Sequence, residues 1–85
     1  MAKLTKAETK WLDELQEVLN RCPSNRLGFA TIGDRDVTVY DTSFSQAIED
    51  HIFSSGTGDF IPTADQLGAV LGEITFPANV ESTAG

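Results

Sequence analysis

The stretch from Thr5 to Pro23 constrains the fold more than any other part of the chain. Apolar side chains recur there at the three- and four-residue spacing of one helix face, and polar side chains fill the other face. Thr5 and Glu8 match a capping box, in which each side chain satisfies a free backbone N–H of the other residue, and Pro23 ends the pattern. We therefore expect an amphipathic helix whose apolar stripe another part of the molecule must cover. The stripe is Trp11, Leu12, Leu15, Val18, Leu19 and Cys22.

The next segment, RLGFATIGDRDVTVYD, predicts an antiparallel β-hairpin. Leu27 and Phe29 alternate with small residues before the polar turn GDRD, and Val37 and Val39 alternate with Thr38 after it. A hairpin alone is only marginally stable in water, so we expect one of its faces to pack on a helix.

The rest of the chain predicts two further short helices and a possible short final strand. DTSFSQAIEDHIF has Ser43 in a capping-box position, with Asp41 and Thr42 as rival caps, and IPTADQLGAVLGEI has Thr63 in such a position before a second helical pattern. EITF then reads as a short strand. The order favours a small single α+β domain over residues 1–77, with the helices on one face of an antiparallel sheet, and residues 78–85 as a flexible C-terminal tail.

The charges of this chain are divided unevenly along its length. Residues 1–35 hold all six Lys and Arg together with five Asp and Glu, whereas residues 36–85 hold eight acids and no Lys or Arg, for a net charge of −7. A typical chain of about 11 per cent Lys plus Arg would place five or six cations in that second segment. Direct binding to nucleic-acid phosphates or to an anionic membrane is unfavourable over most of such a molecule.

No pattern in the sequence indicates an enzyme, a cofactor or a metal site. His51 is the only histidine, and no hydrolytic spacing surrounds it, so we interpret it as a residue at a helix boundary. Asp34 and Asp36 lack the further ligands of a calcium loop and read as turn formers. Cys22 follows a helix C-terminus, where the dipole disfavours a thiolate, and reads as a small core residue. SSGTGD lacks the lysine of a phosphate-binding loop.

The acidic second segment leads to the functional hypothesis. A surface without cations steers and docks onto a basic partner, so we expect a non-enzymatic protein-interaction module that binds through the acids of the predicted second and third helices. The expected partner-binding residues are Asp41, Glu49, Asp50, Asp59 and Asp65. A sharper form of the hypothesis is a DNA-mimic inhibitor. The alternative is a homodimer in which Trp11 lies at an exposed margin of the stripe, with acidity that serves only solubility.

The helix AETKWLDELQEVLNRCPSNRLGF and the hairpin ATIGDRDVTVYD resemble the small accessory proteins of lambdoid phages and enterobacterial prophages. The resemblance covers about residues 1–41 and implies no catalytic residue. It implies a short cytoplasmic protein that binds and redirects a host or phage protein. The sequence itself points the same way, since it has no secretory signal, no apolar run of about 20 residues and a single cysteine.

Overall fold

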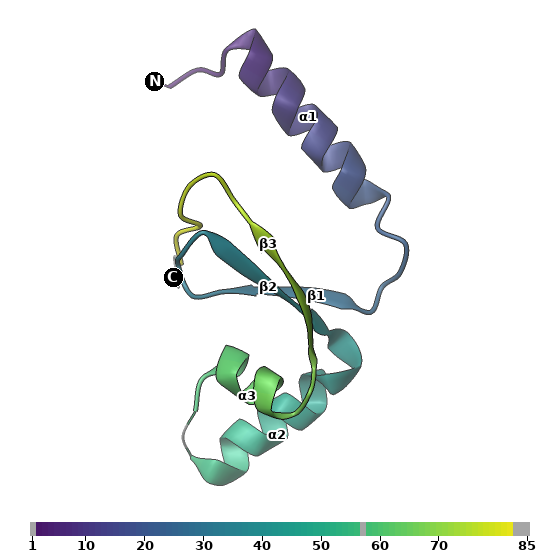
Figure 1. The fold of residues 1–85 in the computed structure, drawn as a ribbon, viewed down its shortest axis with the longest axis vertical. Helices are drawn as coiled ribbons and strands as arrows, with labels where there is room; N and C mark the ends of the chain where they lie inside the picture. Colours follow the sequence, from purple (N-terminus) through teal and green to yellow (C-terminus); the bar gives the residue numbers. More distant parts are fainter. Residues whose placement is uncertain (1, 57, 83–85) are drawn as a thin grey trace.

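The chain folds into three layers, with a small sheet between helix α1 and the pair of helices α2 and α3, as the computed structural model of residues 2–56 and 58–82 shows (Figure 1). The sheet is antiparallel with strand order β1–β2–β3. The predicted α+β class, N-terminal helix, hairpin and final strand are confirmed. The elements are α1 (Lys6–Asn20), β1 (Leu27–Thr31), β2 (Asp36–Asp41), the 3-10 turn η1 (Thr42–Phe44), α2 (Ser45–Ser55), α3 (Phe60–Gln66) and β3 (Val70–Thr75).

Helix α1 begins where the sequence predicts it. The Glu8 N–H donates to Thr5 Oγ1 at 3.1 Å, and the Thr5 N–H donates to Glu8 Oε1 at 2.8 Å, so the capping box is formed. The helix ends at Asn20, and the N–H of Arg21 donates to the Glu17 carbonyl at 3.2 Å. These bonds are local, which is why the sequence predicts this element well.

The hairpin pairs Phe29 with Val39 and Thr31 with Val37 across β1 and β2. Because side chains alternate along a strand, Leu27, Phe29, Val37 and Val39 share one face of the sheet, and Ile74 of β3 joins them opposite Val37. On the other face Gly28 lies opposite Tyr40, whose ring occupies the space that a side chain at position 28 would need. The Tyr40 ring also meets Phe60 edge-on, with centroids 5.0 Å apart.

The third helix lies earlier than the sequence predicted, and the predicted cap at Thr63 is wrong. Helix α3 starts at Phe60, so Thr63 is buried inside it, and the helix ends before Gly68, which has a φ of +78°. A left-handed residue stops a helix, and glycine adopts that conformation at little cost. The segment after Gly68 pairs with β2 as β3, so Val70 and Leu71 lie in a strand rather than in a helix. Of the three caps predicted before the second helix, Asp41 is the one that forms rather than Ser43, and it caps η1.

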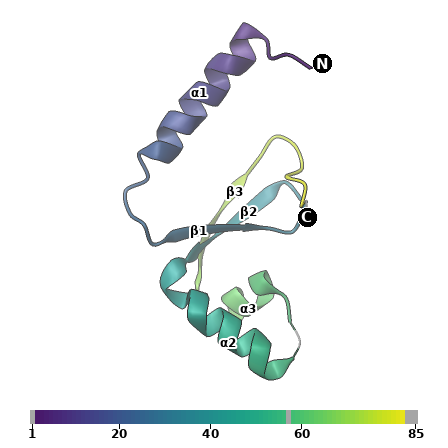
Figure 2. The same cartoon turned by 180° about the vertical axis from the view of Figure 1, so that it is seen from behind.

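The helices do not all lie on one face of the sheet, contrary to the sequence prediction. Helices α2 and α3 pack on the face of Tyr40, and together with the turn before β3 they form the core of Ile48, Ala64 and Ala69. Helix α1 stands across the opposite face, apart from the other helices, in both views (Figures 1 and 2). None of its residues is buried. The apolar stripe is therefore not part of the core.

The segment after β3 returns to the hairpin turn. The Phe76 N–H donates to the Arg35 carbonyl at 2.7 Å, and the Val80 N–H donates to the Asp34 carbonyl at 2.7 Å. The expected tail, residues 78–85, thus has a bond to the turn at its start, and residues 83–85 lie outside the described part of the chain.

The close approach at Gly28 gives a prediction about stability. A Cβ at position 28 would lie 2.5 Å from Tyr40 Cζ and 2.9 Å from Thr42 Cγ2, so the ring must shift away from the core. We expect Gly28→Ala to lower the free energy of unfolding by about 1–3 kcal/mol. Gly72→Ala is the matched control in the same sheet, because nothing lies within 4 Å of its Cβ position and we expect a change within about 0.5 kcal/mol. Urea unfolding of the two variants checks this, and equal losses would contradict it.

Candidate functional site

Four of the five predicted partner-binding residues lie on the helical layer beneath the sheet. Glu49 and Asp50 are exposed on α2, and Asp65 is exposed on α3. Asp59 precedes α3 at the N-cap position, yet its side chain makes no capping bond there. We call Glu49, Asp50, Asp59 and Asp65 the acidic layer. It occupies the end of the molecule farthest from α1, and the sequence of this layer contains no Lys or Arg (Figure 1).

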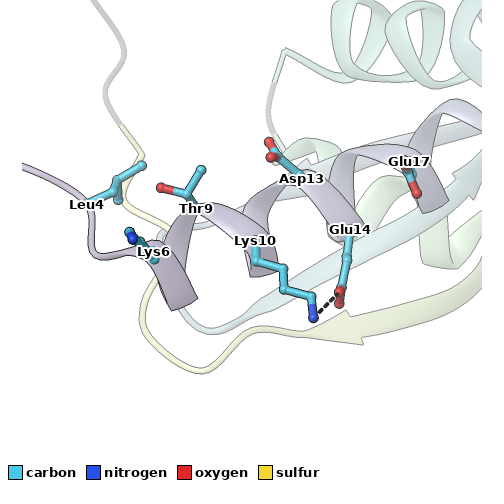
Figure 3. Close-up of a pocket in the computed structure, with 7 residues that line it drawn as sticks. All are labelled: Leu4, Lys6, Thr9, Lys10, Asp13, Glu14 and Glu17. Carbon is cyan, nitrogen blue, oxygen red and sulfur yellow. Dashed lines mark ion pairs between the residues drawn. The ribbon is translucent and has the colours of Figure 1, made fainter.

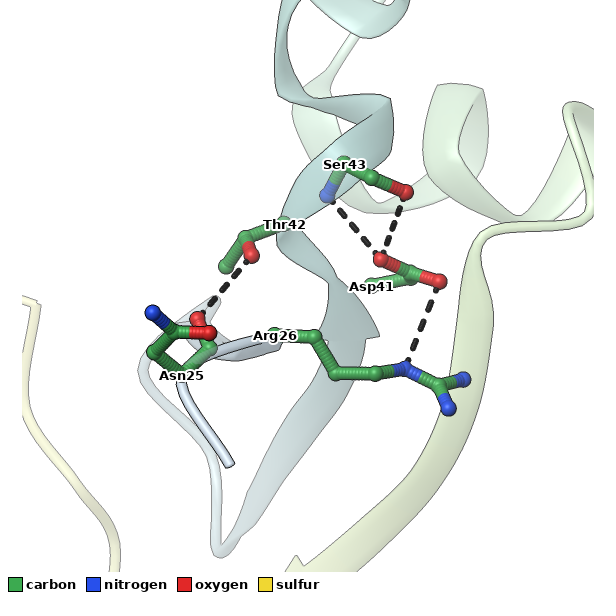
Figure 4. Close-up of polar contacts among 5 residues, drawn as sticks. All are labelled: Asn25, Arg26, Asp41, Thr42 and Ser43. Atoms are coloured by element: carbon green, nitrogen blue, oxygen red, sulfur yellow. Dashed lines mark hydrogen bonds and ion pairs between the residues drawn. The ribbon is translucent and has the colours of Figure 1, made fainter.

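The fifth predicted residue, Asp41, has a different role. It lies at the end of β2, where its Oδ1 accepts hydrogen bonds from the Ser43 N–H at 2.9 Å and the Ser43 hydroxyl at 2.7 Å (Figure 4). Its Oδ2 lies 3.5 Å from Arg26 Nε. The Asp41 carboxylate is thus engaged inside the molecule, and only 17% of its side chain is exposed. We therefore remove Asp41 from the candidate docking surface.

The bonds around Asp41 tie three elements together. The Thr42 N–H donates to the Arg26 carbonyl at 2.7 Å, and the Thr42 hydroxyl donates to the Asn25 carbonyl at 3.3 Å (Figure 4). The Asp41 N–H donates to the Ala69 carbonyl at 2.9 Å. We call this group the Asp41 junction, since it joins the start of β1, the end of β2 with the turn into α2, and the start of β3.

The environment of Asp41 favours its charged form. The hydrogen bond from the Ser43 hydroxyl lowers the pKa of this carboxyl below its ordinary value, and the Ser43 N–H acts in the same direction. Burial opposes this lowering of the pKa, and the Arg26 guanidinium adds the smallest contribution in its favour. A carboxyl with a lowered pKa in the folded state stabilises the fold at pH values above its unfolded pKa. That stabilisation is lost as the pH falls through the folded pKa.

The lowered pKa of Asp41 predicts how the stability of the Asp41→Asn variant depends on pH. At pH 7 we expect the variant to unfold at a lower urea concentration than the original chain, because it loses the ion pair with Arg26 and the charge-assisted bonds to Ser43. The difference should shrink as the pH is lowered below about 4, the ordinary pKa of an aspartate, since the original chain then loses the same charge. Asp13→Asn, on the exposed face of α1, is the control and should follow the original chain at every pH. A difference that stays constant from pH 7 to pH 2 would contradict the prediction.

The outer face of α1 is a solvated helix face with mixed charges. Lys10 and Glu14 form an i,i+4 pair at 4.0 Å, while Asp13 and Glu17 lie beside them in a shallow hollow on the same face (Figure 3). Exposed pairs of this kind contribute a few tenths of a kcal/mol. This face differs from the acidic layer because it carries lysines as well as acids.

An apolar cleft of about 490 Å³ separates α1 from the sheet, and sequence reasoning missed it. The signals were present in the wide helix stripe and in the alternation of the strands, but both were assigned to one closed core. No charged residue lines the cleft. Its walls are Val18, Leu19, Cys22 and Pro23 on the helix side, and Leu27, Phe29, Val37, Ile74 and Phe76 on the sheet side.

The structure shows where the residues that were considered for catalysis or metal binding lie. Asp34 Oδ1 accepts a bond from the Asp36 N–H at 2.9 Å, as in a turn-forming aspartate. Cys22 is exposed rather than a core residue as predicted, because α1 stands away from the sheet. His51 is half-buried on α2 and lines neither the cleft nor the hollow beside α1. Within residues 2–56 and 58–82, no three His, Cys, Asp or Glu side chains gather closely enough to hold a metal ion.

Comparisons of the chain with protein-family models, with curated proteins and with solved structures gave no match. None of the helices that the structure describes combines the length and the apolar character needed to cross a membrane.

Proposed function

We propose that the chain is a non-enzymatic protein-interaction module that docks onto a basic surface of a partner protein through the acidic layer. The observation that carries the proposal is the separation of charge along the molecule. All six cations lie in residues 1–35, on the segment before α1, on α1, on its linker and on the hairpin, while the α2–α3 end carries only acids. A surface of one sign attracts a partner of the opposite sign and repels others of its own sign.

The use of each acid in the structure supports this assignment. Asp41 stabilises the fold at its junction, whereas Glu49, Asp59 and Asp65 are exposed and no ion pair within the described residues involves them. Asp50 accepts a bond from Gln46 Nε2 at 2.9 Å on the exposed side of α2, which keeps its carboxylate at the surface. Acids that neither cap a helix nor neutralise a cation cost self-repulsion, which a basic partner relieves.

The proposal extends to the setting of the protein. The resemblance of residues 1–41 to phage and prophage accessory proteins supports a host or phage protein as the partner, and a single cysteine without a disulfide partner supports a cytoplasmic location. A DNA-mimic inhibitor is the form of this proposal in which the basic partner surface is one that contacts DNA phosphates.

The test compares two variants with the same change in net charge. Glu49→Lys with Asp50→Lys reverses two charges in the acidic layer, whereas Asp13→Lys with Glu17→Lys reverses two on the outer face of α1. We expect the first variant to bind the partner roughly tenfold more weakly and with a flatter salt dependence, because like charges then oppose each other. We expect the second variant to keep most of the affinity. Equal losses in both would show that only net charge matters.

The partner is obtained by capture from a lysate of the source cell. Carbodiimide coupling of carboxylates to neighbouring lysines at low salt, followed by peptide mapping, identifies which acids of this chain face the partner. We expect links through Glu49, Asp50, Asp59 or Asp65 that disappear in high salt, where the Debye length falls from about 10 Å at 0.1 M to about 3 Å at 1 M. Links through Asp13 and Glu17 alone, or capture that high salt does not reduce, would contradict the proposal.

A further inference from the structure

Two apolar surfaces of this chain face each other where α1 stands over the sheet, and both are only partly covered. On α1, 51% of Trp11 and 57% of Val18 are exposed. On the sheet, 51% of Phe29 and 41% of Ile74 are exposed. With Leu12 and Leu19, the exposed parts of these side chains amount to roughly 500 Å² of apolar surface, at the upper end of what a monomer shows.

The exposed area and the radius of the molecule also show that it buries less surface than a compact chain of its length. The chain exposes 6648 Å², whereas a folded monomer of 9.2 kDa is expected to expose about 4,900 Å². Its radius of gyration is 15.6 Å, against about 12 Å for a compact chain of 85 residues. The excess area exceeds the ~800 Å² that each partner buries in an interface of standard size.

The linker between α1 and β1 is fixed at both ends, which holds α1 away from its own sheet. At one end Arg21 and Cys22 donate backbone bonds back into the last turn of α1. At the other end the carbonyls of Asn25 and Arg26 both accept bonds from Thr42. Only two residues lie between these anchors, and one of them is Pro23, whose φ is fixed by its ring. The stripe can close on its own sheet only through rotation within these two residues or through loss of an anchor.

The distribution of charge on the molecule allows a second copy of the chain to pack against the cleft. The walls of the cleft carry no charge, and the acidic layer lies on the other side of the sheet (Figure 1). Two chains of net charge −7 can therefore meet across this face with their acidic layers far apart.

We propose that the chain forms a two-fold dimer in which α1 of each copy packs its apolar stripe on the sheet face of the other copy. One two-fold rotation covers both exposed surfaces of both copies, because the contact of stripe on sheet is made twice. Exchange of a terminal element through a short, fixed hinge is a low-cost route to such a dimer. This inference is independent of the acidic layer, which stays exposed in the dimer.

The first measurement uses the unchanged chain. Sedimentation and light scattering at micromolar concentration should give twice the chain mass of 9.2 kDa. Trp11 is the only tryptophan and lies in the stripe, so its emission should shift to the red when the protein is diluted below the dissociation constant. A particle of one chain mass with concentration-independent Trp11 emission would overturn the proposal, and would show that α1 is either free or closed on its own sheet.

Two variants test which surfaces meet. Leu19→Asp places a negative charge on the stripe and Phe29→Lys places a positive charge on the sheet face. Each should raise the dissociation constant at least about a hundredfold, since both copies of the contact are damaged. Phe53→Asp is the matched control, because Phe53 is 90% exposed on α2, away from the cleft. The control should remain a dimer, and a dimer that dissociates equally in the control would contradict the assignment.

A mixture of the two variants gives the decisive result. In an exchanged pair of Leu19→Asp with Phe29→Lys, one contact joins an unaltered stripe to an unaltered sheet face. The other contact brings the two introduced charges of opposite sign together, so the mixture should form a heterodimer that neither variant forms alone. Circular dichroism of each variant before mixing shows whether it has kept its helices. Failure of the mixture to form any dimer, with both variants folded, would overturn the exchange of α1 even if the unchanged chain is dimeric.

Discussion

The Asp41 junction is the interaction on which the rest of this fold depends. In the space of a few residues the chain leaves the central strand, turns into α2, and receives the start of β3 beside it. The Asp41 carboxylate accepts bonds from Ser43 at the turn into α2, the Asp41 N–H bonds the segment before β3, and the Thr42 N–H and hydroxyl both bond the segment before β1. The small core of Ile48, Ala64 and Ala69 lies directly beyond this point, so the junction fixes the position at which the helical layer meets the sheet.

Local interactions were predictable from the sequence, and long-range ones were not. The capping box of Thr5 and Glu8 and the turn at Asp34 involve residues two or three apart, so the residue types alone indicate them. The helix stripe also indicated the correct element, but not what covers it, because a stripe specifies only that it needs an apolar contact. The start of β3 was read as a helix because Leu67, Val70 and Leu71 also fit a helical spacing, and pairing with β2 decided between the two.

The candidate site was predictable only as a set of residues with one charge. The sequence indicated that residues 36–85 carry no Lys or Arg, and Glu49, Asp50, Asp59 and Asp65 are exposed on the α2–α3 layer. It indicated Asp41 as a possible cap, which the bond to Ser43 confirms, but not the ion pair with Arg26 or the backbone bond to Ala69, because these partners are distant in sequence. The apolar cleft needed the structure, since it results from the position of α1 relative to the sheet rather than from either surface alone.

The position of the acidic layer, on the far side of the sheet from the cleft, has a consequence for binding strength. Any two-fold pair joined through the cleft carries two such layers, one on each copy and both facing outward. Such a pair is bivalent, so a target with two basic sites at a matching separation would hold it by avidity, with a second binding step that is intramolecular. A weak, salt-sensitive contact at each end would then suffice for a long-lived complex, and a single isolated basic site would be bound only briefly.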